Sequence, residues 1–192
     1  MTTPRSPAKE DRAPRRILDA AIRVLVREGA AEASLARIAE EAQVSKALVH
    51  YHFHDREQLL ASVVARLGAR LRERERAAVT AGAGEQAVDV LWGWLDDEIQ
   101  RGELRTVLEL GLERRALIRE AAAAVARQRR ADAATTVDTT FRRLGLRVRV
   151  GPELVAEDWV TFVDGIVLDA GALGAGRIAF DVHWLAVLGL AD

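Results

Sequence analysis

Three of the four histidines and the only tyrosine of this 192-residue chain lie together, at His50, Tyr51, His52 and His54. Such a cluster is typical of two kinds of site, a metal centre and a surface that contacts nucleic acid. In a helix, His50 and His54 share a face, whereas His52 points about 200° away from His50. The chain also lacks cysteine, a common metal ligand. These features disfavour a metal site, and we expect neither a metal ion nor a cofactor.

The composition limits the class of protein. Hydrophobic residues make up 49% of the chain and charged residues 30%, which is typical of a folded globular protein. The absence of cysteine excludes a disulfide framework and a thiol nucleophile. The first fourteen residues are polar and proline-rich, unlike a signal peptide, and no run approaches the roughly 18 apolar residues of a membrane span. We expect a soluble cytoplasmic protein without a membrane partner.

The net charge of -1 conceals an uneven distribution along the chain. Residues 1–16 hold five basic and two acidic side chains, a net charge of +3, whereas residues 145–192 hold three basic and seven acidic ones, a net charge of -4. A basic N-terminal end suits a polyanion such as DNA. Charge also varies by a few units along ordinary protein surfaces, so charge alone leaves both interpretations open.

The spacing of apolar residues predicts an all-α protein. Apolar residues recur three and four positions apart, and none of the four prolines interrupts residues 15–151. Pro14 suits the first turn of a helix, and Gly29 suits its end. The helices beyond residue 80 are expected near residues 85–100, 103–115, 117–143, 152–173 and 179–190.

Two short helices are predicted between the first helix and the fourth. Ser34 and Ser45 are typical N-cap residues, for helices over residues 35–42 and about 46–54. Asp55, with a glutamine three residues later, resembles the cap of the helix that follows.

The second short helix has one apolar and one polar face. Val49 and Phe53, four residues apart, form its inward edge. The other residues spread over the outer surface and its flanks: Lys46, Ala47, His50 and Tyr51 outside, Leu48 and His52 on the flanks. Two short helices with a tight turn between them make a helix-turn-helix, whose second helix enters a DNA major groove about 12 Å wide. Contact with DNA therefore explains the histidine cluster better than a metal does.

The segment SLARIAEEAQVSKALVHYHFHDREQLL, residues 34–60, resembles the helix-turn-helix and following segment of the TetR family of bacterial transcriptional repressors. RRILDAAIRVLVREGA, residues 15–30, resembles the first helix of that family. Beyond residue 80 the resemblance is one of architecture and implies a sequence-variable helical region for ligand binding and dimerisation. Gln43 stands where the family often has glycine, and a left-handed backbone there costs roughly 1 kcal/mol.

The helix pattern and the resemblance together divide the chain. We expect a flexible basic arm over residues 1–14 and a helix-turn-helix DNA-binding domain over residues 15–60. The fourth helix continues to about residue 78 as a connector, where a charged, glycine-containing stretch marks the boundary. Residues 79–192 are expected to form the helical ligand-binding and dimerisation domain.

The residues expected to contact DNA are Ser34, Ser45, Lys46, Ala47, Leu48, His50, Tyr51, His52 and Arg56. Among them Lys46 and His50 are placed to read base edges, and the others to contact a thymine methyl or the DNA backbone. Arg56, a cation at the start of a helix, opposes the helix dipole, so a phosphate bound there would explain it. The arm, with Arg5 and Lys9, either reaches an adjacent groove or is a solubilising tail.

One such domain reads little sequence, so the resemblance implies a homodimer on a palindromic operator in double-stranded DNA. Two recognition helices related by a two-fold axis would enter successive major grooves about 34–36 Å apart. The last two helices are apolar on most of their surface, which predicts burial on both sides and pairing with a second copy. The residues expected at this interface are Ile166, Leu168, Leu173, Trp184, Val187 and Leu188.

All four tryptophans lie in the second domain. On its first helix the apolar spacing places Trp92 on the buried stripe and Trp94 well off it. We expect an apolar cavity for a small-molecule effector of unknown identity, lined by Trp92, Leu95, Leu112, Trp159 and Phe162. Aromatic residues in a filled core are the simpler interpretation of each of these residues taken alone.

Enzyme classes fit the sequence poorly, and we expect no catalytic residue. A ferritin-like metal enzyme needs Glu-x-x-His pairs, but no histidine has a glutamate three residues before it. His183 is the only histidine of the second domain, and no glycine-rich phosphate loop is present. We therefore expect a ligand-responsive, sequence-specific DNA-binding regulator, most simply a repressor. The alternative is a ligand-independent or architectural helical DNA-binding protein.

Overall fold

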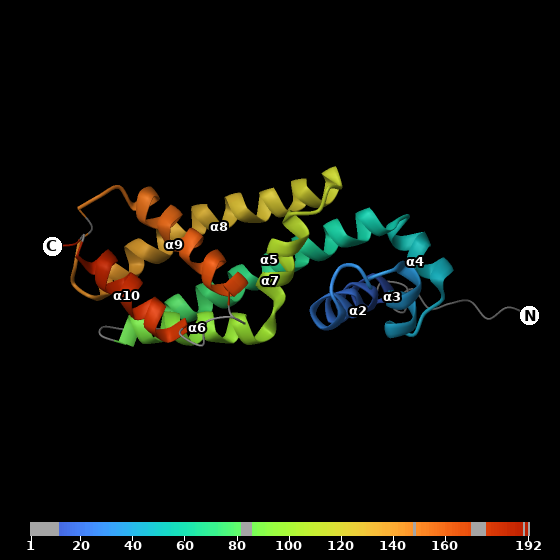
Figure 1. The fold of residues 1–192 in the computed structure, drawn as a ribbon, viewed down its shortest axis with the longest axis horizontal. Coiled ribbons are helices and arrows are strands. Elements are labelled where there is room, and N and C mark those ends of the chain that lie inside the picture. Colours follow the sequence, from blue (N-terminus) through green and yellow to red (C-terminus); the bar gives the residue numbers. More distant parts are fainter. Residues whose placement is uncertain (1–11, 82–85, 148, 170–175, 190, 192) are drawn as a thin grey trace, which may run out of the picture.

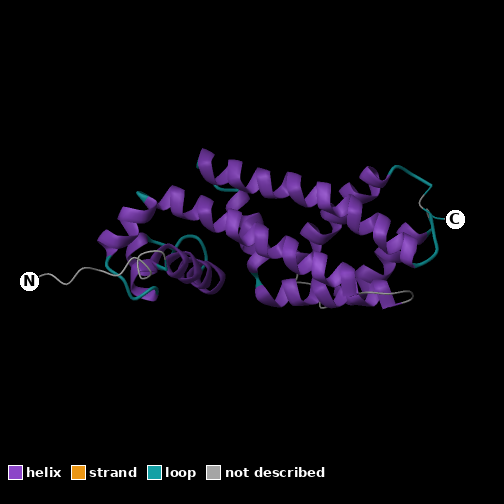
Figure 2. Cartoon of the chain, turned by 180° about the vertical axis from the view of Figure 1, so that it is seen from behind, coloured by secondary structure: helices purple, strands orange, loops and turns teal. Residues whose placement is uncertain are grey.

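The structure, a computed structural model, describes residues 12–81, 86–147, 149–169, 176–189 and 191, which form helices joined by short loops, with no strand among them (Figure 1, Figure 2). The all-α prediction is confirmed. In chain order the helices are α2 (Ala13–Glu28), α3 (Leu35–Glu41), α4 (Lys46–Phe53), α5 (Arg56–Ala81), α6 (Ala87–Arg101), α7 (Glu103–Gly111), α8 (Ala116–Arg143), α9 (Pro152–Asp169) and α10 (Gly176–Leu188).

An apolar core joins α2, α3 and α4 to the first half of α5. Ile17, Ile38 and Val49, one from each of the three N-terminal helices, have no exposed surface. The same core includes Val107 of α7 and Ile118 of α8. The helix-turn-helix region is therefore packed directly against part of the second region. A displacement of α7 or α8 would also displace side chains in the core that contains α2.

Helix α5 is continuous through the charged stretch that resembles a boundary in the sequence. It ends at Ala81, three residues beyond the expected end of the connector. Gly68 lies where α5 crosses α8, and a Cβ there would stand 2.5 Å from Cγ2 of Val125. The glycine thus permits a close approach of the two helices. One rigid helix links the N-terminal core to the bundle.

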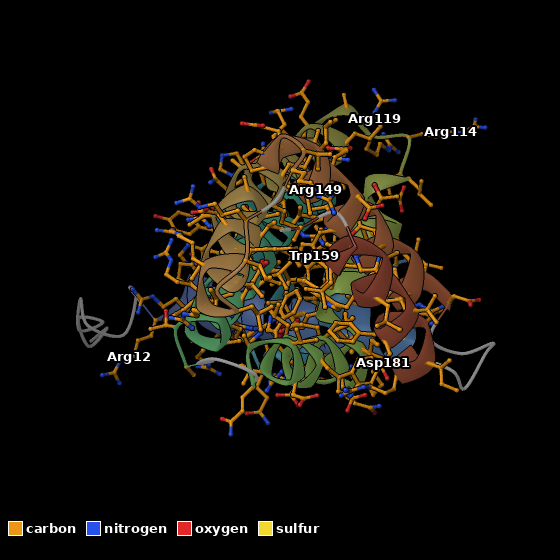
Figure 3. The ribbon with its side chains drawn as sticks, turned by 90° about the vertical axis from the view of Figure 1, so that its left-hand side faces the viewer. Arg12, Arg114, Arg119, Arg149, Trp159 and Asp181 are labelled. Carbon is orange, nitrogen blue, oxygen red and sulfur yellow. The ribbon has the colours of Figure 1, made fainter. Side chains whose placement is uncertain are left out.

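A second core fills the bundle formed by α6, α8, α9, α10 and the end of α5. Its centre is aromatic: the ring centroid of Trp159 lies 6.3 Å from that of Trp94, 5.7 Å from that of Trp184 and 6.3 Å from that of Phe180. Seen from the end of the bundle, Trp159 stands in its middle (Figure 3). Such ring pairs stabilise a core beyond the area they bury.

The predicted buried face of α6 is wrong in one respect. Trp94 is buried, with 6% of its surface exposed, whereas Trp92 is only half-buried. The reason is that α6 packs on two neighbours, so that Glu98 meets α5 while Trp94 meets α9. A face shared between two partners is wider than one apolar stripe, and the spacing of apolar residues alone misplaces its edge.

The predicted interface residues on α10 are also partly wrong. Trp184 and Val187 are 3% and 4% exposed and belong to the core of their own chain. Ile166 and Leu188 are half-buried, Leu168 is 45% exposed, and Leu173 lies outside the described residues. α10 turns its aromatic side inward and leaves another apolar side outside: Ile178, Val182 and Leu185, which are 68%, 61% and 71% exposed.

The molecule is elongated, with the two regions at opposite ends (Figure 1). Helices α2, α3 and α4 lie at one end, α10 lies at the other end, and α5 extends from the first end toward the second (Figure 1, Figure 2). Within the described ranges, none of the helices is long and apolar enough to cross a membrane.

Candidate nucleic-acid interface

The turn between α3 and α4 is fixed by local hydrogen bonds. Ser34 caps α3, as predicted, because its hydroxyl accepts a hydrogen bond of 3.2 Å from the backbone N–H of Arg37. At the other end, the N–H of Val44 donates to the carbonyl of Ala39 over 3.0 Å. Gln43 between them has a φ of 53°, so the left-handed backbone expected at this position is present.

Arg16 adds a support that the sequence pattern does not reveal. Its Nη2 donates to the carbonyl of Ala42 over 2.9 Å, from α2 to the residue that ends α3. A carbonyl at a helix end has no partner within the helix, so this bond both satisfies it and ties the turn to α2. The strained residue Gln43 therefore sits between two anchored neighbours.

Helix α4 presents the face predicted from its spacing. Ser45 caps the helix, because its hydroxyl accepts a hydrogen bond of 3.1 Å from the N–H of Leu48. Val49 and Phe53 are buried, with 0% and 8% of their surface exposed. The side chains predicted to be outside are exposed: Lys46, Ala47, His50 and Tyr51. Tyr51 is 75% exposed, which is unusual for so large a side chain and leaves it free to contact a partner.

The two flanking residues of α4 are half-buried, as predicted, but His52 is less available than the sequence indicates. Its Nε2 is enclosed and has no hydrogen-bond partner in the described part of the chain. Its ring lies edge-on to Tyr51, with centroids 5.1 Å apart. His52 therefore supports the tyrosine ring, and a contact from its Nε2 to a DNA phosphate would require the ring to move.

The role predicted for Arg56 is not the one that the structure gives it. Its Nε donates to the carbonyl of Ala33 over 2.9 Å, and its Nη2 donates to the carbonyl of Ala30. Both carbonyls belong to the loop between α2 and α3. The guanidinium thus closes that loop over the start of α5, which is a structural task that explains a cation at a helix start without a phosphate.

Ion pairs cover the side of α2 and α3 that faces away from the core. Arg37 donates to Glu28 through two nitrogens, at 3.0 and 2.8 Å, and Arg27 reaches both Glu28 and Glu41. Hydrogen bonds from Arg37 and then from Arg27 lower the pKa of Glu28 from 4.5 to about 2. This network orients α3 on α2 and keeps both carboxylates ionised at neutral pH.

The four histidines do not assemble a metal site in the described ranges, where no group of three potential ligands occurs. His54 ends α4 with a φ of 58°, and its N–H donates to the carbonyl of His50. His183, on α10, stacks on Phe162 with centroids 4.0 Å apart, and burial lowers its pKa. Three of the histidines thus lie on α4 or at its C-terminal end, and the fourth is half-buried against the aromatic residues of the bundle.

The five residues predicted to line one apolar cavity fall into two groups. Leu95 and Trp159 are buried in the aromatic core, and Trp92 and Phe162 pack against it. Leu112, in contrast, is 81% exposed after the end of α7 and lines a separate groove between α7 and α8. Grouping it with the tryptophans is wrong because α7 packs toward the N-terminal core and only in part toward α9.

Several buried polar residues escape the sequence pattern altogether. Glu98 is fully buried and receives a hydrogen bond of 2.7 Å from Arg74 of α5. Arg129 is 4% exposed and donates to Asp164, while burial raises the pKa of Glu75. Their signal in the sequence is a charged residue on an otherwise apolar helix face: Glu98 stands three residues after Leu95.

A helix-turn-helix followed by a helical bundle defines a class of DNA-binding protein, and comparisons with known proteins agree. Residues 17–63 match the sequence model of the bacterial regulatory proteins of the tetR family. The chain is 39% identical to the HTH-type transcriptional regulator BetI of Rhizobium meliloti over 67 residues. The match covers 35% of this chain and 33% of the length of BetI.

The fold as a whole is similar to solved regulators. A TetR transcription regulator from Haloarcula marismortui superposes with a TM-score of 0.78 and 19% identity, over 95% of this chain and 100% of that one. A transcriptional regulator from Saccharomonospora viridis, solved in complex with choline, superposes with a TM-score of 0.69 and 20% identity. The match covers 90% of this chain and 94% of that one. The N-terminal part of the chain thus matches the tetR family of bacterial regulatory proteins, and the fold of the whole chain is similar to that of a TetR transcription regulator.

Proposed function

We propose that the protein is a cytoplasmic transcriptional regulator that binds a specific DNA sequence through α4. The observation that carries the proposal is the exposed face of α4, with Lys46, Ala47, His50 and Tyr51 outside while Val49 and Phe53 hold the helix to its core. A helix supported in this way can enter the major groove as a rigid unit. Lys46 is suited to the O6 and N7 acceptors of guanine, and Ala47 to a thymine methyl.

Ser34, Ser45 and Tyr51 are placed to orient the helix on the DNA backbone. Both serine hydroxyls cap helices through their oxygens, so the hydroxyl hydrogen remains available to a phosphate. The N-terminal ends of α3 and α4, which these serines cap, also favour an anion. Arg56 is left out of this set because it holds a loop. Of the basic arm, Arg5 and Lys9 lie outside the described residues, and Arg12 is exposed (Figure 3).

We further propose a homodimer that pairs α9 and α10 with their copies. The support is the outward side of α10, where Ile178, Val182 and Leu185 recur at four and three residues, and Leu168 of α9 is also exposed. Apolar side chains aligned at helical spacing on a surface mark an interaction site. A two-fold axis there would place two α4 helices on a palindromic operator. A small molecule that favours one spacing of these helices would control DNA binding, most simply by releasing a repressor.

The proposal is tested by replacing one base-reading side chain. In Lys46→Ala, the ratio of specific to random-sequence affinity should fall roughly 5- to 150-fold, as expected for the loss of 1–3 kcal/mol at one base contact. Arg127→Ala removes a cation from the exposed surface of α8 and serves as the control. Unchanged selectivity in Lys46→Ala, measured by fluorescence anisotropy on both duplexes, would contradict the assignment of α4 as the reading helix.

A further inference from the structure

A groove of about 450 Å³ runs between α7 and α8, apart from the aromatic core. Its volume is within the roughly 300–1,000 Å³ range of small-molecule sites. The residues that line it are apolar or basic, and none is acidic: Val107, Leu108, Gly111, Leu112, Arg119, Ala122, Ala123, Val125, Ala126 and Arg129. An apolar channel whose charges are all positive is complementary to an anion with a hydrocarbon body.

The floor of the groove is one face of α8. Arg119, Ala122, Ala126 and Arg129 follow one another at three, four and three residues, which places them along one line on the helix. The two alanines are small, and their size makes the hollow. The two arginines are ten residues apart, roughly 15 Å along the helix axis, so a cation stands near each end of an apolar strip.

The two cations differ in their surroundings. Arg119 is exposed, at the outer edge of the molecule in the end-on view (Figure 3). Arg129 is only 4% exposed, and Asp164 of α9 accepts a hydrogen bond of 2.5 Å from its Nη1. In the described part of the chain the Arg129 side chain donates a hydrogen bond to Asp164 alone, and a guanidinium has five N–H donors. A buried guanidinium with donors to spare binds a carboxylate more strongly than an exposed one does.

The opposite wall is open to solvent at its rim. Leu112, which is 81% exposed, offers an apolar side chain that nothing covers in the described structure. Gly111, beside it, would bring an added Cβ to 3.4 Å from Cβ of Ala122, an ordinary contact, so the two walls approach closely at that end. A hydrocarbon chain lying on the alanines would cover Leu112 and gain the free energy of burying both.

We propose that this groove binds an amphipathic monocarboxylate, a free acid with a medium-length hydrocarbon chain, whose carboxylate meets Arg129. The inference rests on the proposed function in that it names the effector class of the regulator. The groove is connected to the N-terminal region through two contacts. Val107 of α7 belongs to the N-terminal core, and the N–H of Leu117 on α8 donates a hydrogen bond of 3.0 Å to Glu57 of α5. An occupant that separates α7 from α8 acts on both contacts.

The test is calorimetric titration of the full-length protein, without DNA, with three eight-carbon probes below their micelle concentrations. Octanoate should bind saturably with one molecule per chain, octanol at least about tenfold more weakly, and octyltrimethylammonium not at all. Saturable binding of the cation, or equal binding of octanoate and octanol, would overturn the carboxylate assignment. Absence of octanoate binding would overturn the site itself, whatever the DNA-binding experiments show.

Two matched pairs of variants locate the site. Ala126→Phe fills the groove and should weaken octanoate binding more than about tenfold, while Ala124→Phe, on the other side of α8, should leave it unchanged. Arg119→Glu should weaken it about threefold, and Arg127→Glu should not. Circular dichroism of each variant confirms folding. Equal loss within either pair would contradict the groove. Octanoate that binds but leaves DNA affinity unchanged would support the groove and count against ligand control in the proposed function.

Discussion

The two regions of the molecule place their charged side chains in opposite ways. Around the helix-turn-helix, Glu28 and Glu41 pair with arginines at the surface. In the bundle, Glu98, Glu75 and Arg129 lie inside, at 0%, 5% and 4% exposure. Surface ion pairs stabilise a fold only slightly, whereas a buried charge that loses its partner is strongly destabilising.

The two regions also differ in how far apart their contacts lie in the sequence. The helix caps and the tight turn of the N-terminal helices involve residues close together in the sequence, although their apolar core also includes Val107 and Ile118. The bundle depends on pairs such as Arg74 with Glu98 and Arg129 with Asp164, which are 24 and 35 residues apart.

The largest effect is expected inside the bundle. Glu98→Ala should lower the free energy of unfolding by about 3 kcal/mol, because it removes a fully buried carboxylate and leaves the half-buried Arg74 with Glu103 as its remaining partner among the described residues. Asp97→Ala, at the neighbouring exposed position, should change it by less than about 0.5 kcal/mol. Urea unfolding of the two variants gives the comparison. Similar losses in both would show that burial does not distinguish the two carboxylates.

A smaller effect is expected at the turn. Gln43 has a φ of 53°, a conformation that glycine adopts without strain. Gln43→Gly should therefore raise the free energy of unfolding by up to about 1 kcal/mol, less the entropy that glycine adds to the unfolded chain. Gln128→Gly, in the middle of α8, should lower it by about 1 kcal/mol. If thermal unfolding shifts in the same direction in both variants, the strain assigned to Gln43 is absent.

The smallest effect is expected at the surface network and should depend on pH. A carboxyl whose folded pKa is about 2, against 4.5 unperturbed, stabilises the fold above pH 4.5 and loses that contribution as the pH falls towards 2. Wild type should lose stability over this interval, and Glu28→Gln should lose less. Glu32→Gln, at an exposed position, should follow wild type. If stability falls with pH in parallel for wild type and Glu28→Gln, then the ionisation of Glu28 does not contribute to the stability of the network.

The same division explains what could be predicted from the sequence. The caps at Ser34 and Ser45 and the buried pair Val49 and Phe53 follow from spacing within a few residues, and the left-handed Gln43 follows from the family resemblance at the turn. These rules depend on short-range geometry, which the sequence shows directly. The helix bounds are predicted to within a few residues for the same reason.

The differences between the structure and the expectations have another cause. Arg56 resembles a phosphate ligand in the sequence, but its partners, the carbonyls of Ala30 and Ala33, become visible only when the loop folds over α5. The apolar spacing around Trp184 predicts an interface with a second copy, but the side of α10 that holds Trp184 faces the core of its own bundle. Which apolar side of a helix faces inward depends on partners more than 12 residues away, and the helical period is the same for both sides.

The central claim is that α4 reads a specific sequence as part of a two-fold dimer, and selection of bound duplexes from a random pool tests it most directly. The selection is done with the full-length protein at moderate salt, followed by sequencing. The account predicts enrichment of a palindrome whose half-sites lie about 34–36 Å apart, in successive major grooves. Binding without enrichment, lost as the salt concentration rises, would contradict it, since charge alone would then hold the DNA.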